Sequence, residues 1–106
     1  MNLDNIIIKT YDEITIKLYK KKVINYAPPL RITTGNYRGE SDYKIKDNGS
    51  IELIEIRISK IDKEWIKNKE NRETVIFHEL AHGFEEDCKS QKHKDIMYKL
   101  KMIFEN

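Results

Sequence analysis

Two histidines and a glutamate form the part of the chain best suited to chemistry. His78, Glu79 and His82 make the pattern HExxH within an otherwise apolar run that extends from Thr74 to Phe84. If this run is helical, His78 and His82 lie one turn apart on one face, where both imidazoles can bind one zinc ion. Glu79 then lies beside the metal, where its carboxylate can act as a general base toward a metal-activated water.

A catalytic zinc usually has three protein ligands and leaves the fourth position to water. We predict His93 as the third ligand, because it is the last of the three histidines of the chain and follows a polar turn at residues 89–92. That turn could bring the last helix back onto the helix that carries the motif. Four other side chains stay open as alternatives: Cys88, Glu86, Asp95 and Glu105.

Composition limits the range of functions. At 106 residues, we expect a single domain over 1–106. Charged residues make up 36% of the chain, but the net charge is only +2, so we expect neither nucleic acid nor an anionic membrane as a partner. The amino terminus lacks the features of a secretory signal, and Cys88 is the only cysteine. We therefore expect a cytoplasmic protein.

The first half of the chain contains a predicted helix and a predicted strand. Apolar residues recur at spacings of four and three, as on one face of an amphipathic helix, at Leu3, Ile7, Tyr11, Ile14 and Leu18. Pro28 and Pro29 end this region, because proline lacks an amide donor and disfavours helix in the residue before it. The alternating segment Leu30 to Thr33 is typical of a strand.

A hairpin is predicted next. Residues 43–46 and the segment Ile51 to Ile58 flank the turn composition Asp-Asn-Gly-Ser at residues 47–50. In the second arm, Ile51 and Leu53 have one phase of alternation, whereas the isoleucines from Ile54 onward have the other. A bulge or bend near Leu53 is needed to keep both sets inside.

The second half is predicted to be helical. Ser59 and Asp62 resemble a helix start, and residues 68–71 form a polar break. The motif helix is expected from about Arg72 to about Asp87. A last amphipathic helix carries an apolar stripe made of Ile96, Met97, Leu100, Ile103 and Phe104.

With these ligands, the sequence resembles the zincin metallopeptidases, most closely SprT-like and minimal gluzincin-type catalytic domains. The specific match is the motif between Val75 and Phe84, followed by a histidine that opens another helix, here His93. The glycine that often follows this histidine in the family is Lys94 here. The resemblance implies an edge strand that pairs with the substrate, for which we take Ile51 to Ile58.

The resemblance also implies an oxyanion stabiliser, for which Tyr37, Tyr43 and Tyr98 are candidates. We therefore predict an α+β, minimal zincin-like domain with an N-terminal helix, a small, mostly antiparallel sheet of three or four strands, the HExxH helix and a C-terminal helix. The expected function is that of a zinc metalloendopeptidase acting on protein or peptide substrates.

Two alternatives remain. One is a non-catalytic, zinc-stabilised protein-interaction module, in which Cys88 would close the metal site as a fourth ligand. The other is a latent peptidase blocked by self-association through an unpaired strand edge, which would make the protein a homo-oligomer.

Overall fold

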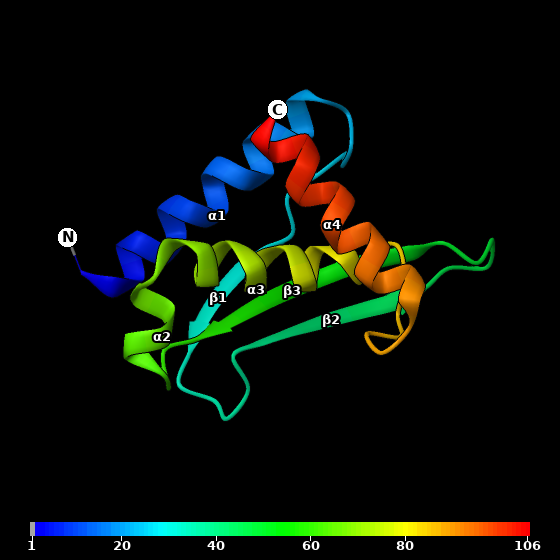
Figure 1. Cartoon of the computed structure of the whole chain (residues 1–106). Coiled ribbons are helices and arrows are strands. Elements are labelled where there is room, and N and C mark those ends of the chain that lie inside the picture. Colours follow the sequence, from blue (N-terminus) through cyan, green and yellow to red (C-terminus); the bar gives the residue numbers. More distant parts are fainter. Residues whose placement is uncertain (1) are drawn as a thin grey trace.

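Three helices lie on one face of a three-stranded sheet in the computed structural model, which describes residues 2–106 (Figure 1). The elements in chain order are α1 (Leu3–Lys20), β1 (Leu30–Thr33), β2 (Gly39–Ile45), β3 (Ile51–Ser59), α2 (Lys63–Lys67), α3 (Lys69–Ala81) and α4 (Gln91–Glu105). This arrangement confirms the predicted α+β fold, including its N-terminal and C-terminal helices.

The sheet is mixed and has the strand order β1-β3-β2. β1 pairs with β3 in parallel, and β2 pairs with β3 in the longer, antiparallel ladder. The prediction that Ile51 to Ile58 forms an edge strand is wrong, because β1 occupies the side of β3 that was expected to be free. β2 is instead the edge strand that lies beside α3 (Figure 1).

The predicted bulge is present where β2 meets β3. Asp42 pairs with Glu55 and Tyr43 pairs with Leu53, so that Ile54 is an extra residue on β3. Leu53 is 6% exposed, whereas Ile54 is 49% exposed. The bulge thus changes the phase of β3 and directs Leu53 toward the same core as the isoleucines that follow, while Ile54 itself is outside.

The predicted hairpin turn and the first helix are also confirmed. Gly49 has a φ of 84°, which favours glycine, and its amide donates to the carbonyl of Lys46. The stripe of α1 lies in the core, and only its first member is partly exposed. The amide of Asn5 donates to the side chain of Asn2, which caps the helix.

The helix that carries HExxH begins and ends earlier than predicted. The predicted break is confined to Asn68, which ends α2 in an extended conformation, and residues 69–71 already belong to α3. The side chain of Asn68 caps α3 by accepting a hydrogen bond from the amide of Asn71. The helix ends at Ala81 with His82 as its C-cap, and turns follow where the prediction extended the helix to Asp87. The preceding short helix has Asp62 as its N-cap, whereas Ser59 belongs to β3.

The core lies between the sheet and the helices. Its fully buried side chains include Ile7, Ile14, Leu18, Ile56, Ile58 and Ile76. Arg72 is also buried and joins α3 to α1, because its Nε donates to Thr10 Oγ1 at 3.0 Å.

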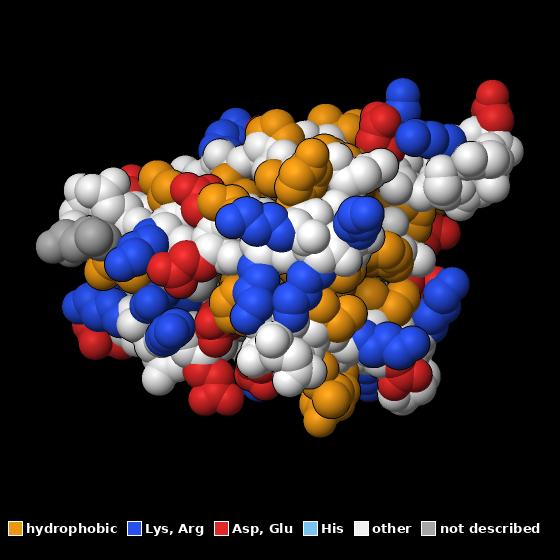
Figure 2. Space-filling model, turned by 90° about the horizontal axis from the view of Figure 1, so that it is seen from above, with side chains coloured by type: hydrophobic (Ala, Val, Ile, Leu, Met, Phe, Trp, Pro, Cys, Tyr) orange, Lys and Arg blue, Asp and Glu red, His pale blue; other side chains and the backbone are white. Residues whose placement is uncertain are grey.

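Figure 2, viewed from above, shows basic, acidic and hydrophobic side chains intermixed on that face of the molecule. Within residues 2–106, no helix has the length and apolar character needed to cross a membrane.

Candidate metal site

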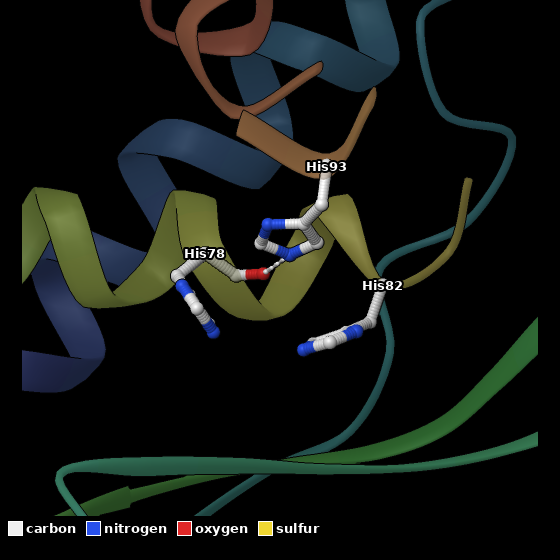
Figure 3. Close-up of side chains that lie close together, drawn as sticks. All are labelled: His78, His82 and His93. Carbon is white, nitrogen blue, oxygen red and sulfur yellow. Dashed lines mark hydrogen bonds between the residues drawn. The ribbon is translucent and has the colours of Figure 1, made fainter. Parts of the chain in front are cut away.

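Two of the three histidines lie one turn apart at the end of α3. His82 keeps helical backbone angles, with φ −64° and ψ −16°, although it is the C-cap. Its side chain therefore leaves the helix on the same side as that of His78, and the two ring centroids are 5.3 Å apart (Figure 3). The predicted geometry of the HExxH pair is present even though the helix ends at the second histidine.

The third histidine reaches this pair from α4. Ser90 caps α4 by accepting a hydrogen bond from the amide of His93, which fixes the histidine in the first turn of the helix. The His93 ring is 1% exposed, and its centroid lies 4.6 Å from that of His78 and 4.6 Å from that of His82. Figure 3 shows His93 entering from α4 above the other two rings.

The three imidazoles fit a metal ion. One ligand atom from each residue lies within 4.8 Å of the other two. Nitrogens bound to one tetrahedral zinc at about 2.0–2.1 Å are about 3.4 Å apart. Side-chain rotations that move the nitrogens by on the order of 1 Å would therefore complete the coordination. His78, His82 and His93 can hold a metal ion, and each of them is a residue that the sequence predicted.

Hydrogen bonds to backbone carbonyls hold two of the rings. The Nδ1 of His82 is 3.2 Å from the carbonyl oxygen of Glu85, and the Nε2 of His93 is 3.0 Å from that of His78. A carbonyl oxygen only accepts, so each of these nitrogens carries the proton. For His82 this leaves Nε2 with a free lone pair for a metal. If Nε2 of His93 bound a metal, it would give up its hydrogen bond to the carbonyl oxygen of His78, and the ion would take the place of that oxygen as its partner.

Burial favours the neutral form of two of the rings, which is the form that binds a metal. Burial lowers the pKa of His78 to about 4, and the neighbouring rings of His93 and His82 add to this effect. Burial also lowers the pKa of His82, with a further contribution from His93. The surroundings of His78 and His82 thus favour neutral imidazoles, which can bind a metal.

Comparison of the chain with protein families, with curated proteins and with solved structures finds no match. The chemistry of the site therefore rests on the residues themselves.

Glu79 lies between α3 and β2 and is 4% exposed. Its Oε1 accepts a hydrogen bond of 2.7 Å from Ser41 Oγ on β2, and its Oε2 is 4.0 Å from Nε2 of His78. Burial raises the pKa of the Glu79 carboxyl to about 7, and the Ser41 hydrogen bond opposes this rise. A carboxyl group with a pKa near neutrality, next to the histidines, is suited to accept and return a proton.

Gly39 allows β2 to approach this carboxylate closely. A Cβ atom at this position would be 2.7 Å from Val75 Cγ2 and 2.8 Å from Glu79 Oε2, distances that side chains do not tolerate. The predicted hairpin begins only at residue 43, so the sequence identified neither Gly39 nor Ser41 as part of a strand. The segment 37–42 has no alternating apolar residues, so nothing in the sequence identified it as the beginning of a strand.

A groove of about 360 Å³ begins at His78 and Glu79 and runs toward the start of α3. Tyr37 and Trp65 contribute to its walls, so Tyr37 is the oxyanion candidate that shares a cavity with His78 and Glu79. Tyr43 stacks parallel to the His82 ring at 6.4 Å, and its hydroxyl donates to Glu86.

The other alternative residues lie outside the histidine group. The side chain of Tyr98 is 64% exposed on α4, and Asp95 accepts a hydrogen bond from Gln91 on the surface. Cys88 is an exposed, free thiol. Within the described part of the chain, the group of side chains that could hold a metal contains the three histidines and neither Cys88 nor Glu86 nor Glu105.

Proposed function

We propose that the protein is a zinc-dependent metallopeptidase that hydrolyses peptide bonds. The observation that carries this proposal is the convergence of three imidazoles from α3 and α4 next to the buried carboxylate of Glu79. Three nitrogen ligands are typical of catalytic zinc, since they leave a fourth position to water, whereas structural sites are closed by four protein ligands.

Each residue has a distinct task in this reaction. Bound zinc would supply a Lewis acid that polarises the substrate carbonyl and acidifies water. Glu79 accepts the proton of the attacking water at Oε2, the oxygen that faces His78, and later passes it to the leaving amine. The burial of Glu79 favours this exchange, because it raises the pKa of the carboxyl into the range where both protonation states are accessible.

The substrate is expected to bind along β2. This strand lies at the edge of the sheet, and its residues Gly39, Ser41 and Tyr43 contact the side chains of Glu79 and His82. An extended peptide can add to an exposed edge through main-chain hydrogen bonds. Such a peptide would pass directly beside the histidines, with the groove at Tyr37 available for one of its side chains.

Replacement of Glu79 tests the proposal. Zinc content and hydrolysis of an unfolded protein substrate are measured for the wild type, Glu79→Gln and His78→Ala, each loaded with zinc. We expect one zinc per chain in the wild type and in Glu79→Gln, weak or absent zinc in His78→Ala, and cleavage by the wild type alone. Cleavage retained by Glu79→Gln would refute the mechanism, and a zinc-loaded wild type without cleavage would refute the function.

The second candidate is a zinc-stabilised interaction module. It is favoured by His93, whose deeply buried ring joins α4 to the backbone of α3 in the manner of a structural residue. In this case zinc would raise the melting temperature, but the zinc-loaded wild type would cleave no peptide. The two candidates are therefore separated by the same set of variants.

A further inference from the structure

We propose that Ser41 is a positioning residue that orients the carboxylate of Glu79, so that the edge strand β2 prepares the general base as well as receiving the substrate. The expected effect of Ser41 on catalysis rests on the proposed function. The orientation of the Glu79 carboxylate by Ser41, however, can be tested without measuring activity. The contact joins two residues 38 positions apart in the sequence, and neither the HExxH pattern nor its spacing indicates it.

The first step concerns the freedom of the Glu79 carboxylate. The last torsion of a glutamate side chain joins an sp³ carbon to an sp² carbon, and it is broad and roughly two-fold rather than staggered. Packing around the side-chain stem therefore leaves the plane of the carboxylate undefined. A donor at one oxygen is the means by which this plane is fixed, and Ser41 Oγ provides it at 2.7 Å from Oε1.

The second step concerns the other oxygen. Gly39, two residues before Ser41 on the same strand, lies against Glu79 Oε2, and a Cβ atom there would be 2.8 Å from that oxygen. Residues 39 and 41 point to the same side of β2, because side chains alternate along a strand. The strand thus donates to Oε1 and, because Gly39 has no Cβ, leaves room for Oε2, which lies 4.0 Å from Nε2 of His78.

The third step concerns the donor itself. Serine has a single hydroxyl proton, and the alternative acceptor, the backbone oxygen of Glu79, is 3.4 Å away. The much shorter contact to Oε1 makes the carboxylate the main acceptor. The Ser41 backbone pairs with Ile56, a fully buried residue of the central strand, so the hydroxyl is presented from a rigid element.

The test compares four zinc-loaded proteins: the wild type, Ser41→Ala, Ser41→Thr and Ser50→Ala. Ser50 is an exposed serine of the hairpin turn, so Ser50→Ala makes the same chemical change away from the site. The first readout is the crystal structure. The expected result is a single Glu79 conformer with Oε1 bonded to the hydroxyl in the wild type and Ser41→Thr, and a rotated or multiply placed carboxylate in Ser41→Ala.

The second readout is kinetic. For Ser41→Ala we expect kcat to fall on the order of tenfold with KM changed less than about twofold and zinc content unchanged, and Ser41→Thr to recover most of kcat. An unchanged Glu79 carboxylate in Ser41→Ala would overturn the proposal, and so would a loss that appears only in KM. If the wild type cleaves nothing, the proposed function fails, while the crystal structures still decide whether Ser41 orients Glu79.

Discussion

Helix α3 has two neighbours across the candidate site, and they differ in what they contribute. On one side, α4 supplies His93, a ring that is 1% exposed and bonded to the backbone of α3. On the other side, β2 supplies Gly39 and Ser41, which contact the carboxylate of Glu79 from a strand with a free edge. The three histidines form the candidate metal-holding half of the site, and its member His93 belongs to the core. The half that would handle proton and substrate lies at an open edge.

This difference predicts that substitutions in the two halves change different properties of the protein. A change on the α4 side should remove the metal and weaken the fold together, because the same ring serves both. A change on the β2 side should reduce the rate while the metal stays bound. Four further sets of variants test this separation.

The largest effect is expected for His93→Ala. Zinc affinity should fall by more than about 100-fold, since loss of even an outer hydrogen-bond partner of a metal ligand costs up to about that much. The metal-free protein should also lose about 1–3 kcal/mol of unfolding free energy, because the carbonyl of His78 loses a buried partner. Calorimetric zinc titration and urea unfolding measure the two quantities.

Tyr98→Ala is the matched control for this variant. Tyr98 lies on the same helix with its side chain 64% exposed, so zinc affinity and stability should stay close to those of the wild type. Unchanged zinc affinity in His93→Ala would show that another residue completes the site and would remove α4 from the metal-holding half.

The second-largest effect, a loss of stability, is expected at the bulge between β2 and β3. Leu53→Ala should lower the free energy of unfolding by about 2–4 kcal/mol, because a buried leucine is truncated. Ile54→Ala, one residue away, should change it by less than about 0.5 kcal/mol, because the bulge places this side chain outside. Equal losses in the two variants, measured by urea unfolding, would mean that the phase of β3 does not change at this point.

A smaller loss of stability is expected for Gly39→Ala, which adds the Cβ atom that β2 lacks next to Val75 and Glu79. We expect a loss of about 1–3 kcal/mol and a reduced kcat at unchanged zinc content. Gly35→Ala provides the control, because a Cβ there would meet its nearest neighbour at 3.6 Å. If Gly39→Ala bound no zinc, the two halves of the site would not be separable.

The smallest effect should come from the face of the sheet that is turned away from the helices. Arg57 forms ion pairs there with Asp42 and Glu55, whose carboxylates are partly exposed, so salt screens these pairs in part. Arg57→Met should cause a smaller loss of stability than His93→Ala, Leu53→Ala or Gly39→Ala, with zinc content and kcat unchanged. Unfolding at low and at high salt measures this loss, which should shrink as salt is added; a loss that is independent of salt would contradict it.

The sequence predicted those features that depend on local patterns. The stripe of α1 and the turn at Gly49 follow from spacing and composition within one element. The phase conflict around Leu53 likewise predicted the bulge, because only a bulge can bury residues of both phases. The pairing of His78 with His82 needed no tertiary information, and His93 followed from the need for a third ligand.

Two features that depend on distant contacts were not predicted. The position of β3 in the centre of the sheet results from the parallel pairing of Leu30 with Ile56, which no local pattern reveals. The part of β2 beside Glu79 is polar in sequence, since its inward positions are Gly39 and Ser41 rather than apolar residues. The contacts of these two residues with Glu79 become visible only in the structure, where α3 brings Glu79 against β2.

The most direct test of the account is a crystal structure of the wild type grown with zinc, with the metal located by its anomalous scattering. The account predicts one zinc bound by His78, His82 and His93, with solvent at the fourth position and Glu79 Oε2 facing that solvent. Zinc enclosed by four protein ligands, or zinc bound without His93, would contradict it.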